Sequence, residues 1–154
     1  MNKKKYLYLI LISLLLVNCT KQSPATTIVF NPDINIVINN SLNESIQFEV
    51  ELADTDYKRE RGLMYRRSLA ENQGMFFDFP NSEIRSFWMK NTYLSLDLLF
   101  IDENYFIVDL HEQAFPLRED PILSKVPAKY VFEIKSGMCQ KMNIKLGDKV
   151  VLQQ

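Results

Sequence analysis

Hydrophobic and polar residues alternate without a break along residues 46–52 of the chain. The apolar members of this stretch, separated by glutamine or glutamate, are Ile46, Phe48, Val50 and Leu52. A repeat of two residues places all four on one face of a β-strand and the polar side chains on the other. The pattern therefore predicts a strand with one buried and one solvated face, and a shorter apolar stretch at residues 34–38 predicts the strand before it.

Several later stretches are rich in β-branched and aromatic residues, which favour strands. We expect these strands at residues 75–79, 87–90, 97–101, 105–110, 130–135 and 149–152. Residues 98–101 are apolar on both faces, which indicates a central strand, and the polar residues 102–104 predict a tight hairpin loop. Prolines discourage both helix and central strand, so the three prolines of residues 111–127 predict a loop there.

Residues 54–67 carry the one long pattern that is typical of a helix. The Thr-Asp pair near its start can cap it, and Tyr57, Arg61 and Met64 fall on one face. If that face is buried, the Arg61 guanidinium points inward. A buried guanidinium needs a carboxylate or several carbonyl groups as partners, so this helix predicts an acid elsewhere in the fold.

These elements together predict the class of fold. About eight short strands, one helix near residues 55–67 and a single helical turn at residues 138–143 indicate a mostly β protein, either a small antiparallel barrel or a compact sandwich. We expect residues 33–154 to form one domain. The hydrophobic fraction of 47 % allows an apolar core to hold that domain together.

The start of the chain has the organisation of an exported protein. Three lysines precede an apolar run at residues 6–17, which is shorter than the roughly 20 residues that span a membrane. The run ends in Leu-Val-Asn before Cys19, an order that resembles a bacterial lipobox. We therefore expect a lipoprotein signal peptide at residues 1–18, acyl chains such as palmitate on Cys19 and a flexible tether at residues 19–32. The alternative is a secretory signal or uncleaved anchor in which Cys19 is incidental.

Charge and thiol content change with this maturation. Loss of residues 1–18 removes three lysines and no acid, so the formal net charge falls from −1 to −4. No basic excess then remains to follow a phosphate backbone, which argues against nucleic acid as a partner. A lipid on Cys19 leaves Cys139 as the only thiol, so no internal disulfide is expected. We predict a monomer that faces the periplasm or the cell surface and contacts the membrane through its anchor.

Familiar catalytic and metal-binding patterns are missing from the sequence. The only histidine, His111, lies in a polar segment and has no second histidine with which to bind a metal. A nucleophilic pair of Cys139 and His111 would need the two to meet, and cysteine is usually buried. The four glycines form no phosphate-binding loop. We therefore expect no metal, no cofactor and no catalytic residue of a familiar kind.

Polar and charged residues next to the apolar strands form the remaining candidate site. They are Arg61, Arg66, Lys90, Asn91, Asp97 and Glu133, with Trp88 as a core anchor beside them. Because alternate strand residues share a face, an inward Trp88 would bring Lys90 inward as well. One interpretation is a buried network in which a cation of the set pairs with one of its two acids. The other is a pocket whose cations receive an anionic or carbonyl-bearing ligand.

Five segments carry a pattern that extends over most of the predicted domain. They are RERGLMYRR at 59–67, GMFFDFP at 74–80, FWMKNTYLSLDLLFID at 87–102, PAKYVFEIKSG at 127–137 and IKLGDKV at 144–150. In order and spacing they resemble the family called domain of unknown function 192, with FWMKNT as the most specific string. Ser95 departs from that family, in which proline is usual at this position. The resemblance implies a β-rich, barrel-like fold in an exported or membrane-associated protein, and it implies no established biochemical role.

Three functions are compatible with these residues. The first is a lipid-anchored binding or accessory module for a small ligand or an envelope protein. The second is an enzyme of unfamiliar type, with Asp97 or Glu133 in acid–base chemistry. Lys90 or Arg61 would then stabilise developing negative charge, and a titratable group with a shifted pKa should lie in a cleft. The third is a purely structural envelope protein, in which the polar set would be wholly internal.

Overall fold

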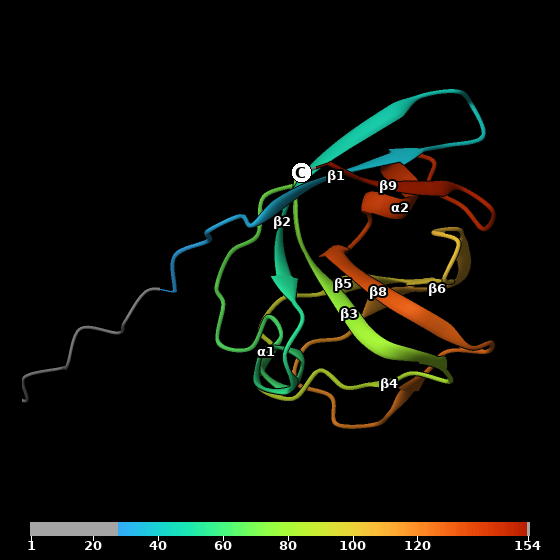
Figure 1. The fold of residues 1–154 in the computed structure, drawn as a ribbon. Coiled ribbons are helices and arrows are strands. Elements are labelled where there is room, and N and C mark those ends of the chain that lie inside the picture. Colours follow the sequence, from blue (N-terminus) through green and yellow to red (C-terminus); the bar gives the residue numbers. More distant parts are fainter. Residues whose placement is uncertain (1–27, 154) are drawn as a thin grey trace, which may run out of the picture.

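The computed structural model describes residues 28–153, and this part of the chain forms nine strands and two helices (Figure 1). In chain order the elements are β1 (Ile34–Asn39), β2 (Ser45–Ala53), α1 (Asp56–Arg61), β3 (Gln73–Glu83), β4 (Ser86–Phe87), β5 (Leu96–Ile101), β6 (Ile107–Ala114), β7 (Ile122–Leu123), β8 (Ala128–Lys135), α2 (Met138–Lys141) and β9 (Lys149–Gln153). Strands dominate, so the predicted mostly β class is confirmed.

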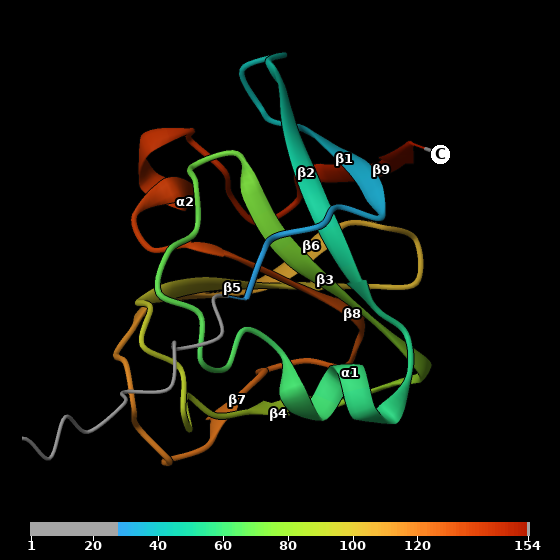
Figure 2. The same cartoon turned by 90° about the vertical axis from the view of Figure 1, so that its left-hand side faces the viewer.

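Seven of the strands form one curled sheet in the order β6-β5-β8-β3-β2-β1-β9. All neighbours run antiparallel except β2 and β3, which are parallel because α1 and the chain after it cross over between them. The two edges of the sheet approach each other where Phe106 pairs with Lys149, so the sheet curls into a half-barrel. β4 and β7 pair separately. Figure 2 shows α1, β4 and β7 on one side of the sheet and α2 on the other.

Side chains of the sheet alternate between two apolar clusters. The inner cluster lies inside the curl, includes Phe48, Phe76 and Phe132, and receives Met138 and Cys139 from α2. The outer cluster lies on the opposite face, includes Phe77 and Phe100, and is covered by the segments around α1, β4 and β7. Both faces of β5 are buried between these clusters, so the prediction of a central strand is confirmed.

Most predicted strands are present, with small differences at their ends. The strand predicted at residues 87–90 is wrong beyond Phe87, because Lys90 and Asn91 form a turn in which Asn91 has φ of 54°. The predicted loop at residues 111–127 is also wrong in part. β6 continues to Ala114, and β7 pairs with β4 within this segment, while all three prolines lie between the strands rather than in them.

The helix predicted at residues 54–67 is present but much shorter, since α1 ends at Arg61. Thr55 caps it as predicted, and its hydroxyl accepts a backbone amide hydrogen bond. Gly62 ends it, with φ of 48° and ψ of −139°, a conformation that suits glycine best. Tyr57 and Arg61 are exposed, so the prediction that Arg61 points into the core is wrong.

The predicted signal peptide, Cys19 and most of the predicted tether lie outside the described residues. At the described end of the tether, Phe30 packs against the outer cluster, and the Asn31 amide donates to the Glu51 carboxylate at 2.8 Å. Within residues 28–153, no helix is long and apolar enough to cross a membrane.

Candidate functional site

Asp97, one of the two predicted acids, is fully buried and binds backbone amides. Its Oδ1 accepts from the Gln113 amide at 2.9 Å, and its Oδ2 accepts from the Cys139 amide at 3.0 Å. Gln113 lies where the register of β5 and β6 shifts and has φ of 57°. The Asp97 carboxylate therefore fixes a β-bulge on one side and the start of α2 on the other, on the inner face of the sheet.

Arg66 meets an acid that the sequence did not single out. Its guanidinium pairs with Glu51, and both side chains are about nine-tenths buried. The alternation of β2 predicts a solvated Glu51, but the chain after α1 covers this end of the strand. The pair ties that covering segment to the sheet.

Trp88 points to the surface, opposite to the prediction. Trp88 is 46 % exposed, whereas Met89 is 1 % exposed and belongs to the outer cluster. Lys90 follows Trp88 to the surface, where its Nζ lies 3.8 Å from the Glu119 carboxylate and 5.3 Å from the centre of the Trp88 ring. Trp88 is thus not a core anchor, because the turn at Lys90 and Asn91 leaves too little strand to bury it.

A cavity of about 250 Å³ lies on the outer face of the sheet, between α1, β3, β4 and β8. Its walls are mostly apolar and aromatic, with Phe77 and Phe79 from β3, Phe87 from β4 and Trp88 after it. Residues 59–64 line it from the side of α1. The structure thereby brings three members of the predicted set to one place: Arg61, Trp88 and Glu133.

Glu133 lies deep in this cavity and is only 5 % exposed. It belongs to the outer face of β8, opposite Leu98 of β5 and Met75 of β3. Among the described residues, no group donates a hydrogen bond to its carboxyl group and no cation pairs with it. Burial raises the pKa of Glu133 to about 8, because the ionised form loses its hydration and gains nothing in exchange. We call this space the Glu133 cavity.

Gly62 lies beside the carboxyl group, and the contacts that a side chain would make there are ordinary ones, so its φ of 48° rather than space favours glycine. A Cβ atom at this position would lie 4.0 Å from Glu133 Oε2 and 3.4 Å from Cζ of Phe77. Two further residues near the mouth, Tyr65 and Asn91, have φ of 64° and 54°, and the Tyr65 amide donates to the Asn91 carbonyl at 2.8 Å. Such conformations are uncommon for residues other than glycine and cluster at binding and catalytic sites.

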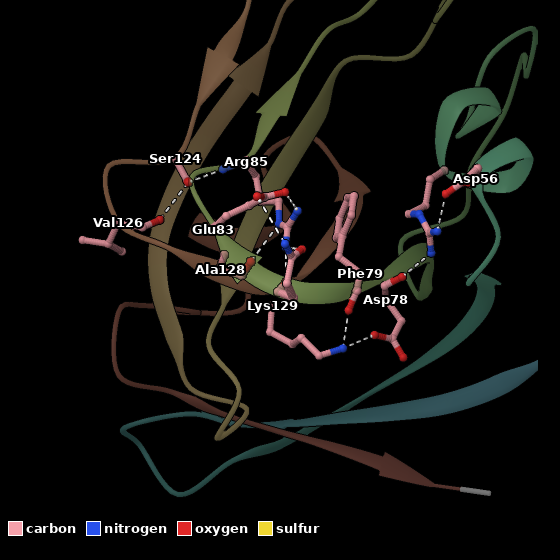
Figure 3. A network of polar contacts seen from close by, with 11 residues as sticks. Asp56, Asp78, Phe79, Glu83, Arg85, Ser124, Val126, Ala128 and Lys129 are labelled. Carbon is pink, nitrogen blue, oxygen red and sulfur yellow. Dashed lines mark hydrogen bonds and ion pairs between the residues drawn. The ribbon is translucent and has the colours of Figure 1, made fainter.

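A buried arginine packs against the Phe79 ring of the cavity wall. The Arg85 guanidinium lies 4.0 Å from the centre of the Phe79 ring. It also donates to the Ala128 carbonyl at 2.8 Å and to the Glu83 carboxylate at 2.8 Å, as Figure 3 shows. Burial lowers the pKa of Arg85 from its usual value, and the charge of Glu83 opposes that effect. Arg85 therefore links the end of β3 to β8.

The other side of Phe79 is tied to α1. Arg59 donates to the Asp78 carbonyl and to the Asp56 carboxylate, both at 2.6 Å, and its guanidinium lies 5.5 Å from the centre of the Phe79 ring. Lys129 of β8 donates to the Asp78 carboxylate at 2.6 Å and to the Phe79 carbonyl (Figure 3). These contacts position the wall of the cavity without using the Glu133 carboxyl group.

A second hollow of about 320 Å³ continues from the mouth of the cavity over the surface, and we call it the outer groove. It shares Arg61 and Trp88 with the Glu133 cavity and adds Tyr57 and Tyr65. Lys90 and Asn91 of the predicted set also line it. Aromatic side chains thus lead from the surface into the cavity.

The geometry gives no support to the nucleophilic pair of Cys139 and His111, which the sequence had already disfavoured. Cys139 is a free, buried thiol, and burial together with the Asp97 charge raises its pKa far above the usual value. His111 is exposed on β6, opposite Leu98 in the register. Among residues 28–153, no group of three or more His, Cys, Asp or Glu residues is placed to hold a metal ion.

Several residues of the site escaped the sequence reasoning. Phe77 and Phe79 alternate on β3 and could have been assigned to one face with Met75, but nothing local indicated a cavity there. Nothing in the sequence around Arg85 or Gly62 indicated that either residue belongs to the site. Their roles depend on β8, which lies far away in the chain.

Comparison with known proteins identifies relatives of the whole domain. The model of the DUF192 family, described as "Uncharacterized ACR", matches residues 37–152. A UPF0127 protein of Pyrococcus horikoshii is 30 % identical over 120 residues, which are 75 % of this chain and 96 % of that protein. A UPF0127 protein of Thermococcus sibiricus is 32 % identical over 120 residues, covering 75 % of this chain and 73 % of that protein.

Two crystal structures have a similar fold. One is a protein of Sinorhizobium meliloti 1021 described as a candidate transcription regulator, with a TM-score of 0.76 and 38 % identity over 77 % of this chain and 92 % of that chain. The other is a protein of unknown function from Novosphingobium aromaticivorans, with a TM-score of 0.74 and 31 % identity over 77 % of this chain and 84 % of that chain.

Proposed function

The chain belongs to the DUF192 family, and on that premise we propose that it is a lipid-anchored envelope protein that binds a small organic molecule in the Glu133 cavity. One observation carries the proposal: a buried carboxyl group without a partner in the described chain opens into an aromatic-walled cavity. Apolar cavities with a few polar groups are typical of small-molecule sites.

The energetics of Glu133 support binding over a purely structural role. A buried carboxyl group without a hydrogen-bond partner lowers stability, and an apolar residue of similar size would avoid that cost. Groups that are kept at the expense of stability are frequent in functional sites. Asp97, the other buried acid of the set, has its two oxygens on backbone amides, so it serves the scaffold.

The binding test uses Trp88, the only tryptophan of the chain, as its reporter, because this side chain lines both the Glu133 cavity and the outer groove. Aromatic fragments bearing amine, alcohol or acid groups are added to the purified full-length chain while Trp88 fluorescence is followed. Ser86→Phe places a large ring at the cavity, and Ser45→Phe places the same ring at the exposed first residue of β2 as the control. We expect fragments to bind the wild type and Ser45→Phe and to lose at least about tenfold in affinity for Ser86→Phe. Equal binding to all three proteins would contradict the proposal.

The anchoring part of the proposal comes from the leader of the sequence. We infer a signal peptide at residues 1–18, acyl chains on Cys19, a tether that ends near residue 32 and a monomeric domain facing the periplasm or the cell surface. Two acyl chains suffice for stable membrane attachment. The full chain should incorporate labelled palmitate and enter the membrane fraction, and Cys19→Ser should abolish both. Unchanged labelling in Cys19→Ser would refute the lipid anchor.

An enzymatic role is the second candidate, and the raised pKa of Glu133 favours it. A carboxyl group with a pKa of about 8 can give or take a proton near neutral pH. Arg61 lines the same cavity from its exposed side, and in this role it would stabilise a developing negative charge on a bound substrate. If the wild type converts a bound fragment into a different compound and Glu133→Gln does not, this role is established. If every bound fragment is recovered unchanged, the protein binds without catalysis.

A further inference from the structure

The chemical character of the ligand follows from the lining of the cavity, if the proposed binding function holds. We propose that the Glu133 cavity takes a ligand that carries a protonated amine, whose ammonium group pairs with the Glu133 carboxylate. The aromatic side chains around the carboxyl group would hold the hydrocarbon part of the ligand.

Glu133 is the only charged residue among the described residues that are buried and line the cavity. Leu63 and Phe77 are buried beside it, and Phe79 and Phe87 are half-buried. The Thr92 hydroxyl already donates to the Lys90 carbonyl. A ligand rich in hydroxyl groups would leave most of them without hydrogen-bond partners against these walls, which is costly. A single ammonium group avoids this, because it meets the carboxylate and the aromatic faces attract a cation.

The charges around Glu133 leave its carboxyl group available. Arg59, Glu60 and Arg61 face the cavity from the side of α1. The lining residues from β3, β4 and the segment after it carry no charge, and Leu98 and Met75 flank Glu133 on the neighbouring strands. Arg59 already binds the Asp56 carboxylate. Burial is the only cause that raises the pKa of Glu133, so neither guanidinium group neutralises it.

Binding of an ammonium group then involves a proton. In the free protein at pH 7, Glu133 is mostly protonated, because its pKa is about 8. The amine pairs with the ionised form, so each binding event below pH 8 releases one proton from Glu133 to water. Affinity for an amine should therefore rise about tenfold from pH 6 to pH 7 and level off above pH 8. A neutral ligand that accepts a hydrogen bond from the protonated acid should show the opposite trend.

The test compares three probes with one skeleton: benzylamine, benzyl alcohol and benzoate. Each is titrated into the full-length chain at pH 6, 7 and 8, and Trp88 fluorescence reports binding. We expect benzylamine to bind at least about tenfold more tightly than benzyl alcohol at pH 8 and benzoate to bind least. The amine affinity should increase with pH, and the alcohol affinity should stay level or decrease.

Glu133→Gln keeps the size of the side chain and removes its charge. In this variant, benzylamine should lose its advantage over benzyl alcohol and its pH dependence, and the affinity for benzyl alcohol should change far less than the affinity for benzylamine. Thermal unfolding checks that the variant is folded. Binding of the alcohol or benzoate as tight as that of the amine would overturn the amine inference and leave the binding function intact. Failure of all three probes, together with the wider fragment set, would overturn both.

Discussion

Two acids are buried at adjoining positions of the central strands, on opposite faces of the same sheet. Among residues 28–153, only one of them has hydrogen-bond partners. Asp97 on the inner face accepts two backbone amide hydrogen bonds. Glu133 is next to it in the register, where Leu98 opposes Glu133 and Asp97 opposes Ile134. It faces the outer cavity and finds no partner in the described chain. Buried charge thus supports the scaffold on one face and is left available to a ligand on the other.

Removal of the Asp97 carboxylate should have the largest effect on stability. Asp97→Ala leaves two buried amides without an acceptor and opens a small space between β5 and α2. We expect a loss of roughly 4–6 kcal/mol in the free energy of unfolding, measured by urea denaturation. A loss below about 1 kcal/mol would mean that the bulge and α2 form without this acid, and the contrast between the two faces would disappear.

Glu133→Gln should change how stability depends on pH. The folded protein keeps the Glu133 proton up to about pH 8, whereas the unfolded chain releases it near the ordinary value of 4.5. The folded state therefore binds more protons between these values, so wild-type stability should fall as pH rises from about 5 to 8. Over this pH range, the free energy of unfolding of Glu133→Gln should rise relative to that of the wild type by on the order of 4 kcal/mol.

Urea denaturation of both proteins at pH 5, 6, 7 and 8 provides the measurement. The difference between them isolates Glu133, because the other titrating groups are shared. Stabilities that change in parallel would show that Glu133 is solvated or paired in solution.

Glu51 offers an intermediate case, since it is buried and also has a cation. Glu51→Gln removes the charge that meets Arg66 and keeps an oxygen for the Asn31 amide. We expect a loss of roughly 1–3 kcal/mol in the free energy of unfolding. Arg66→Met, measured alone and combined with Glu51→Gln, gives the coupling between the two side chains; complete additivity would argue against the pair.

The smallest effect is expected where both partners meet water. Asp54 pairs with Lys58 at 3.0 Å at the start of α1, and this hydrogen bond lowers the pKa of Asp54. Exposed pairs of this kind contribute about 0–1 kcal/mol, and salt weakens them. Asp54→Asn should therefore change the midpoint of thermal unfolding only slightly, and less at 1 M salt than at low salt. A loss as large as that of Glu51→Gln would contradict the ranking by burial.

Local patterns predicted the strands well because alternation depends on neighbouring residues. The faces of β8 follow directly from Tyr130, Phe132 and Ile134, which also place Glu133 on the other side. Whether an acid on that side has a partner depends on segments far away in the chain, and no local pattern records it. The sequence could therefore name Glu133 as a candidate but could not separate it from Asp97.

The error at Trp88 has a similar physical origin. Trp88 and Met89 are both apolar, so hydrophobicity alone does not decide which of them points inward. The turn at Asn91, with its positive φ, ends the strand early and turns Met89 to the core. A positive φ at asparagine is tolerated but not required, so the sequence did not predict it.

The order of the strands also sets the time at which the fold can be completed. β1, near the start of the described chain, lies between β2 and β9, which contains its last residues. In a chain made from the N-terminus onward, the second edge of β1 stays unpaired until the more than one hundred residues between β1 and β9 have been synthesised. Pairing of such distant segments makes folding slow. The emerging chain therefore stays without its complete sheet, and with an open strand edge, until β9 has been made.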